Sequence, residues 1–183
     1  EIDGNRLETI GGLAVIDWNA DGRDDLAAWN HGRTLQIFVN DGEGGFETIQ
    51  DPMEPQAVGL GHLYVQLDGE GPPEWISSQV RGCEDGTAWF GLFRRTPNGL
   101  IEAGRSLSFA QDCDNYGAIR YQHIEAEDID GDGDLDLYFS GFGAPDSMSK
   151  ERNQFTGEDG QPNRLFINSG NLEFKEVADA RGV

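Results

Sequence analysis

The stretch DIDGDGDLDLYF, residues 128–139, places an acidic residue at nearly every second position and then continues into apolar and aromatic residues. Carboxylates this close together repel one another, so the segment either stays unfolded or surrounds a positive charge. Gly131 and Gly133 favour the second interpretation, because glycine lets the backbone turn sharply at positive φ. The stretch therefore predicts a cation-binding loop that leads directly into a buried strand.

The spacing of the oxygen atoms in this loop is typical of calcium coordination, in which carboxylates and a backbone carbonyl alternate along a short turn. An EF-hand would require a glutamate at the twelfth position, where Phe139 stands instead. The flanking segments alternate in polarity as strands do, so we expect a loop between two β-strands. The expected ligands are Asp128, Asp130, Asp132, the carbonyl group of Asp134, and Asp136.

The same spacing occurs in two earlier segments. DWNADGRDDLAAWN, residues 17–30, predicts a second calcium loop, with the ligands Asp17, Asn19, Asp21, the carbonyl group of Arg23, and Asp25. QLDGEGPPEWI, residues 66–76, keeps the frame but has longer side chains and two consecutive prolines, so it is either a weaker metal site or a turn that has lost its ion. Its candidate ligands are Gln66, Asp68, Glu70, the carbonyl group of Pro72, and Glu74.

Each loop is followed by a strand, a glycine-containing turn and a further strand, which gives about four short strands in each repeat. Four-stranded sheets repeated along a chain are typical of β-propeller blades. We expect one all-β, partial propeller domain over residues 1–183, with the last strand of a preceding blade at 1–10, blades at 11–50, 57–105 and 118–183, and a polar insertion at 141–163. Closed propellers have about four to eight blades, so a longer chain, other protein chains or further copies of this chain would complete the ring.

These repeats resemble the FG-GAP and VCBS-type calcium-binding β-propeller repeats. The third repeat, DIDGDGDLDLYF followed by NRLFINSGNLEFKEVADARGV, resembles the version in bacterial surface and secreted proteins and in the related ASPIC/UnbV group. The resemblance covers nearly the whole chain. It implies a propeller fold, structural calcium in the loops that begin at Asp17 and Asp128, and an extracellular or cell-surface location.

Composition limits the classes of partner. The formal net charge of −21 argues against nucleic acid and anionic membrane surfaces as partners, because phosphate binding depends on clustered basic residues. No stretch approaches the roughly 20 apolar residues of a membrane span. The adjacent pair Arg94 and Arg95 is interpreted as solvating a hairpin. The two cysteines, Cys83 and Cys113, either form a disulfide, as in secreted proteins, or remain two free thiols.

No catalytic constellation is recognisable. The three histidines, His31, His62 and His123, fall in three different repeats, and no HExxH, GxSxG or phosphate-binding motif occurs. We expect a non-enzymatic module for protein interaction, adhesion or self-assembly. Insertion 141–163 is the expected partner-specific surface, because it is the longest departure from the repeat. The main alternative is a carbohydrate-binding propeller in which an exposed aromatic residue such as Trp18 stacks on sugar, and a less favoured one is an enzyme carried on a propeller.

Overall fold

The computed structural model describes residues 10–30, 36–50, 61–96, 99–114, 121–141 and 162–183. It divides into two compact units, residues 1–58 and 59–183, and each is described by itself. The strand expected at residues 1–10 and most of the insertion expected at 141–163 lie outside the described residues. The described residues form three antiparallel sheets and almost no helix, so the all-β class predicted from the sequence is confirmed.

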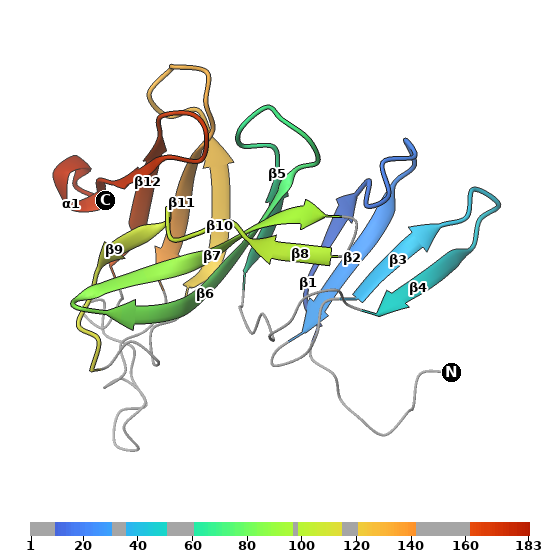
Figure 1. The fold of residues 1–183 in the computed structure, drawn as a ribbon, viewed down its shortest axis with the longest axis horizontal. Helices are drawn as coiled ribbons and strands as arrows, with labels where there is room; N and C mark the ends of the chain where they lie inside the picture. The colour runs from blue at the N-terminus through green and yellow to red at the C-terminus, as the bar shows by residue number, and fades with distance from the viewer. Residues whose placement is uncertain (1–9, 31–35, 51–60, 97–98, 115–120, 142–161) are drawn as a thin grey trace. The chain divides into compact units, whose positions relative to one another are not determined.

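The first unit holds one four-stranded antiparallel sheet with the strand order β1-β2-β3-β4 (Figure 1). Val15 lies opposite Leu26, and Leu26 lies opposite Phe38, so these three residues share one face of the sheet. Ala27 and Ile37 alternate with them and are fully buried on the other face. The strands are β1 (Ile10–Ile16), β2 (Asp25–Asn30), β3 (Gln36–Asn40) and β4 (Phe46–Gln50).

The second sheet has the order β5-β6-β7-β8, and a fifth strand, β9, pairs with the first half of β7. The long hairpin between β6 and β7 turns at Asp85 and Gly86, both at positive φ, as a two-residue Asp-Gly hairpin requires. The sequence did not predict β9 or the length of this hairpin. The strands are β5 (His62–Val65), β6 (Glu74–Glu84), β7 (Thr87–Thr96), β8 (Gly99–Glu102) and β9 (Ser108–Ala110).

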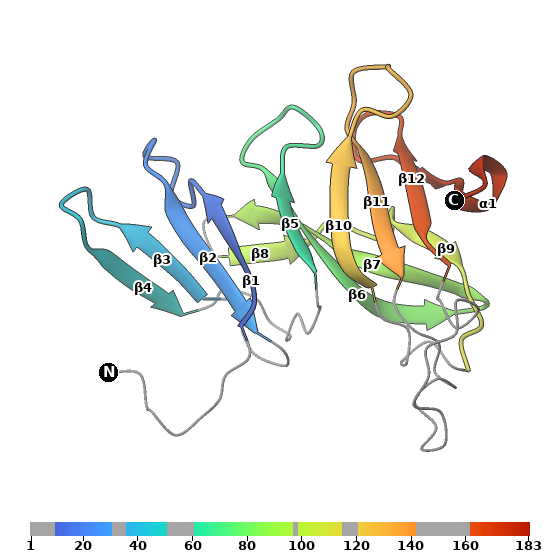
Figure 2. The same cartoon turned by 180° about the vertical axis from the view of Figure 1, so that it is seen from behind.

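The third sheet has the order β10-β11-β12-β13, and Figure 2 shows β10, β11 and β12 side by side. A one-turn helix, α1 (Ala178–Arg181), follows it and ends at Gly182, whose φ of 74° is the usual left-handed helix end. Val177, just before the helix, donates its backbone N–H to the Leu165 carbonyl at 2.8 Å. The strands are β10 (Tyr121–Glu127), β11 (Asp136–Gly141), β12 (Arg164–Asn168) and β13 (Phe174–Glu176).

The second and third sheets share one apolar core within the second unit. Phe90 of β7 stacks on Phe139 of β11 with ring centroids 4.1 Å apart, and Tyr121 meets the edge of Phe90 at 4.8 Å. The buried guanidinium of Arg164 lies over the Phe109 ring and donates to the Tyr121 hydroxyl at 3.2 Å. This core holds β5–β6 and β10–β11 in fixed positions, and with them the acidic loops that join these strands.

Candidate metal centre

In each sheet, the predicted acidic loop joins the first strand to the second: β1 to β2, β5 to β6 and β10 to β11 (Figure 1). Gly22, Gly71 and Gly133 all adopt positive φ at the sixth position of their loops. The fourth position is also left-handed in all three loops, and there Ala20 takes the place that glycine has in the other two. The three loops therefore share left-handed residues at their fourth and sixth positions, in keeping with their common residue spacing.

The loop of residues 128–136 brings three carboxylates together. One oxygen atom from each of Asp128, Asp130 and Asp136 lies within 4.8 Å of the others, a separation that suits a bound metal ion. Among the described residues, these three side chains form the one group of acidic, cysteine or histidine residues whose ligand atoms lie close enough together to hold a metal ion. The carboxylate of Asp132, which was also expected to be a ligand, does not belong to this trio. For Asp134 the expected ligand is the backbone carbonyl group, which is not a side-chain atom of this kind.

Backbone N–H groups surround Asp128 in this loop. Gly131 and Asp132 donate to its Oδ1 at 2.7 and 3.1 Å, and Gly133 donates to its Oδ2 at 3.1 Å. Loss of hydration and the neighbouring carboxylates, chiefly Asp132, raise the pKa of Asp130 above its usual value. The loop therefore concentrates negative charge around a rigid turn, an arrangement that a hard divalent cation would stabilise.

The loop of residues 17–25 has the same hydrogen-bond pattern. Asp17 accepts from the backbone N–H groups of Asp21 and Gly22, both at 3.0 Å, as Asp128 does from its own turn. The guanidinium of Arg23 forms an exposed ion pair with Asp21. Some loss of hydration raises the pKa of Asp21, but hydrogen bonds from Asn19 and Arg23 outweigh it and hold the pKa below its usual value.

The last acidic residue of each loop ties the loop to its sheet. Asp25 and Asp136 are fully buried, and one oxygen of each accepts the backbone N–H of the second loop residue, Trp18 at 2.8 Å and Ile129 at 2.9 Å. The other oxygen accepts the N–H of the residue that ends the third strand, Asn40 at 2.7 Å or Asn168 at 2.9 Å. Both carboxylates thus have a structural task besides the ligand role that the sequence predicted.

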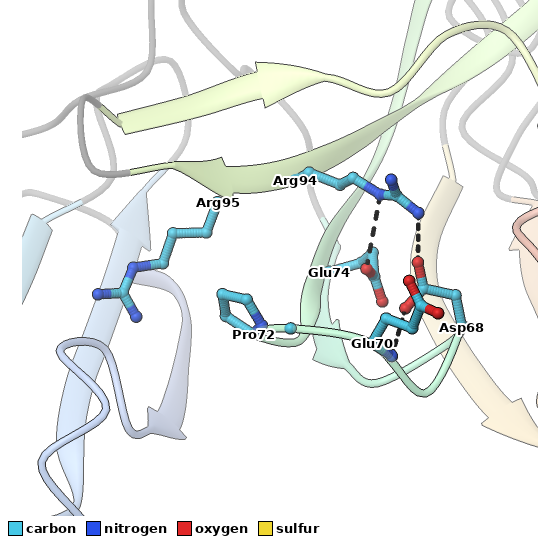
Figure 3. Close-up of a pocket in the computed structure, with 7 residues that line it drawn as sticks. Asp68, Glu70, Pro72, Glu74, Arg94 and Arg95 are labelled. Atoms are coloured by element: carbon cyan, nitrogen blue, oxygen red, sulfur yellow. Dashed lines mark hydrogen bonds and ion pairs between the residues drawn. The ribbon is translucent and has the colours of Figure 1, made fainter.

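In the loop of residues 66–74 an arginine lies against the carboxylates (Figure 3). Arg94, on β7, donates to Asp68, and its Nε lies 4.0 Å from Glu74 Oε1. Burial raises the pKa of Glu74, whose Oε2 accepts the Leu67 N–H at 2.9 Å. Asp68, Glu70, Pro72, Glu74 and both arginines line a pocket of about 270 Å³. Arg94, interpreted from the sequence as solvating a hairpin, thus also pairs with the carboxylates of this loop.

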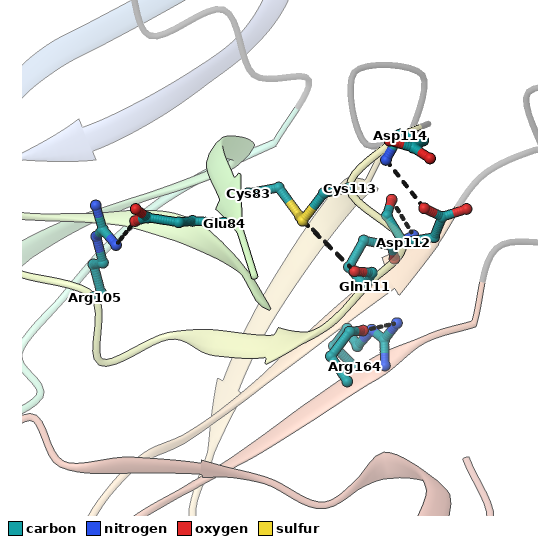
Figure 4. The surroundings of a disulfide bond; sticks show 9 residues. Cys83, Glu84, Arg105, Gln111, Asp112, Cys113, Asp114 and Arg164 are labelled. Carbon is teal, nitrogen blue, oxygen red and sulfur yellow. Dashed lines mark hydrogen bonds and ion pairs between the residues drawn. A yellow bond between two sulfur atoms is a disulfide. The ribbon is translucent and has the colours of Figure 1, made fainter. Parts of the chain in front are cut away.

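Cys83 and Cys113 are joined by a disulfide, the first of the two alternatives that the sequence left open (Figure 4). The bridge connects the end of β6 to the segment after β9, where both sulfur atoms lie within 3.9 Å of the Gln111 carbonyl oxygen. Nearby, Arg105 pairs with Glu84 at 2.8 Å and lies 3.8 Å from the centre of the Trp89 ring. The disulfide thus fixes the strand that sequence reasoning did not predict.

The aromatic and imidazole side chains belong mainly to the packing. Trp18, which was expected to be an exposed loop residue, is buried with 7% of its surface accessible, and its backbone N–H donates to the buried carboxylate of Asp25. Trp75 is fully buried, as its strand position predicted, and donates through Nε1 to His62 Nδ1 at 3.0 Å. His62 is partly buried and His123 is an exposed partner of Glu125, while His31 lies outside the described residues.

The structural role of two asparagines in equivalent positions was not predicted from the sequence. Asn40 and Asn168 end the third strand of their sheets, and each side-chain oxygen accepts the N–H of a glycine two residues later, at 2.9 and 3.1 Å. The shared strings FVNDG and FINSG could have identified them. Asn168 also donates to the carbonyl groups of Leu67 and Leu135 at 3.2 Å each, which links the loops 66–74 and 128–136.

No protein-family model matches the chain, and no curated protein matches it in sequence. No helix among the described residues is both long enough and apolar enough to cross a membrane.

Proposed function

We propose that this chain is a non-enzymatic, calcium-binding β-propeller module that acts outside the cell in protein interaction, adhesion or self-assembly. The observation that carries the proposal is the convergence of Asp128, Asp130 and Asp136 within 4.8 Å in a turn joining two strands. Hard carboxylate oxygens favour calcium or magnesium over softer metals, and a flexible set of several carboxylates favours calcium. The matching hydrogen bonds around Asp17 extend the proposal to a second ion in the loop of residues 17–25.

In this proposal calcium is a structural ion. It neutralises carboxylates that otherwise repel one another, and it fixes the turn between the first two strands of a sheet. Because the native state alone offers the assembled ligands, binding adds to the stability of the fold by mass action. Extracellular calcium modules work with dissociation constants of about 10⁻⁴–10⁻³ M, and the Cys83–Cys113 disulfide is compatible with the same oxidising compartment.

The propeller part of the proposal is supported by the repeated strand order. Three sheets each follow a four-strand meander, and each has its acidic loop between the first and second strands. The three sheets formed by the described residues are fewer than the blades of a closed propeller. We therefore propose that further blades come from a longer polypeptide, from other proteins or from copies of this chain, and that loops and edges of the rigid sheets contact the partner.

Thermal unfolding with calcium and with a chelator tests the role of the ion. We expect calcium to raise the Tm of the wild type, and we expect Asp132→Ala and Asp21→Ala each to weaken this effect by reducing the negative charge around one ion. Asp112→Ala, a change at an exposed acidic residue outside the three loops, serves as the control. An identical Tm with calcium and with chelator would refute a structural calcium role.

Light scattering in calcium and in chelator tests assembly. A calcium-dependent oligomer would support ring completion or larger assembly by copies of this chain. A monomer under both conditions would rule out self-assembly and leave a longer polypeptide or other proteins as the source of the further blades. Sugar stacking on Trp18 or Trp75 is not proposed, because both side chains are buried.

A further inference from the structure

The loop of residues 66–74 has the frame of a cation site. Gly69 and Gly71 adopt positive φ at the positions where the third loop has Gly131 and Gly133. Gln66 Oε1 accepts the N–H of Gly69 at 3.0 Å, as Asp128 accepts the N–H of Gly131. The turn is therefore formed in the same way, with an amide oxygen in the first position in place of a carboxylate.

The two inner carboxylates of this loop are nearly inaccessible to water. The side chain of Asp68 is 5% exposed and that of Glu74 is 1% exposed. Two charged carboxylates removed from water at this spacing require a positive partner. Arg94 supplies it from a neighbouring strand: its Nη2 pairs with Asp68 and its Nε lies 4.0 Å from Glu74 (Figure 3).

Arg94 differs in this respect from Arg23 of the first loop. Arg23 belongs to the loop itself and pairs with Asp21, whose side chain is 24% exposed. The two arginine side chains are exposed to a similar degree, 45% for Arg23 and 48% for Arg94, so the difference lies in the burial of their partners. Arg94 reaches the loop from β7, more than twenty residues further along the chain, and contacts the two carboxylates that are most buried. In the first and third loops the equivalent oxygen of the ninth residue accepts a backbone N–H from Asn40 or Asn168.

We propose that the Arg94 guanidinium takes the place of a divalent cation in the loop of residues 66–74, and that its removal uncovers a further calcium site. The ligands of that site would be Gln66, Asp68, Glu70 and Glu74, which border the pocket of about 270 Å³ or form its turn. The wild-type loop consequently keeps its conformation without metal. Through Asn168, which donates to Leu67 and Leu135, this metal-independent loop supports the neighbouring loop of residues 128–136.

The test compares calcium stoichiometry, measured by equilibrium dialysis up to about 10⁻² M calcium, in the wild type and in Arg94→Gln. We expect Arg94→Gln to bind one more ion per chain than the wild type, and its Tm to depend more strongly on calcium. Arg105→Gln is the matched control, because Arg105 also pairs with a carboxylate of the same sheet, but at the surface. Folded Arg94→Gln that binds the same number of ions as the wild type would overturn the proposal.

A second variant covers the case in which Arg94→Gln does not fold in chelator. If calcium restores its fold, the proposal is supported. The double variant Asp68→Asn with Arg94→Gln removes both charges of the Asp68–Arg94 ion pair. We therefore expect it to fold in chelator and to bind no additional ion. Failure of Arg94→Gln to fold even in calcium would overturn the proposal, whether or not the double variant folds.

This test does not depend on the calcium sites proposed above, because it measures the difference in the number of bound ions between the wild type and Arg94→Gln. A wild type that binds no calcium beside an Arg94→Gln variant that binds one ion would refute the proposed function and support this inference. If the wild type and the Arg94→Gln variant both bind two ions, the proposed function is supported and this inference is refuted.

Discussion

The backbone N–H of Asn168 donates a 2.9 Å hydrogen bond to Asp136 Oδ1, although the two residues lie 32 positions apart in the chain. The second oxygen of Asp136 accepts the N–H of Ile129 at the same distance. One buried carboxylate therefore joins the acidic loop, the second strand and the end of the third strand of its sheet. Asp25 makes the equivalent pair of bonds with Trp18 and Asn40.

Asp136→Asn should destabilise the second unit even without calcium. The amide that replaces one carboxylate oxygen points an N–H group at another N–H group, and an unsatisfied buried donor costs about 1–3 kcal/mol. We expect a loss of about 2–4 kcal/mol in the free energy of unfolding, measured by urea denaturation in chelator. Asp132→Asn, a change at an exposed residue of the same loop, should cost about 0.5 kcal/mol or less there. Equal losses for the two variants would refute the structural role of Asp136.

Ala20→Gly should stabilise the first unit. Ala20 has a φ of 59°, which L-residues adopt at a cost of about 1–2 kcal/mol, whereas the other two loops have glycine at this position. Glycine removes that strain but increases the freedom of the unfolded chain, so we expect a net gain of about 0.5–1 kcal/mol in the free energy of unfolding. Ala28→Gly, a change within β2, is the control and should destabilise. A loss of stability in Ala20→Gly would contradict the left-handed conformation.

Reducing the Cys83–Cys113 disulfide should destabilise the second unit by about 3–4 kcal/mol, since the bridge closes a loop of 30 residues. The double variant Cys83→Ser with Cys113→Ser should show the same loss without reductant. Denaturation with and without reductant measures the effect, and the double variant should be insensitive to reductant. Unchanged stability of the wild type in reductant would show that the bridge contributes nothing to the fold.

Acid should destabilise the second unit through His62. Burial lowers the pKa of His62 from 6.5 to about 4, so the native state excludes a proton that the unfolded chain binds. The contribution of His62 to the free energy of unfolding is therefore fully present above pH 6.5. It is lost as the pH falls toward 4, by about 3 kcal/mol in total. His62→Gln should show a smaller loss over this range, because glutamine does not titrate. Parallel pH profiles for the two proteins, measured by urea denaturation, would contradict a buried neutral His62.

Local patterns in the sequence predicted the acidic loops and the four-strand repeats correctly. The loops follow from glycine and acidic residues at fixed spacing, and the strands from alternating polarity, which are properties of adjacent residues. The contact of Arg94 with Asp68 was not predictable in this way, because strand pairing brings together residues that are far apart in the chain. Strand β9 was missed for the same reason, since its pairing with β7 depends on a distant hairpin and a disulfide.

The candidate ligands show a second limit of pattern reasoning. Asp128 and Asp136 have the same side chain and belong to the same spacing, yet Asp128 accepts N–H groups within its own turn and Asp136 joins the turn to the sheet. A carboxylate is suited to both tasks, so residue type alone could not show that Asp136, besides being a candidate ligand, also joins the loop to the sheet. The burial of Asp136 and its bond to Asn168 depend on the fold.

The most direct test of the central claim is the number of calcium ions bound per chain, measured by isothermal titration calorimetry on the wild type and on Asp128→Asn with Asp130→Asn. We expect two ions for the wild type, in the loops 17–25 and 128–136, and one for the double variant. A folded wild-type protein that binds no calcium up to about 10⁻² M would contradict the claim.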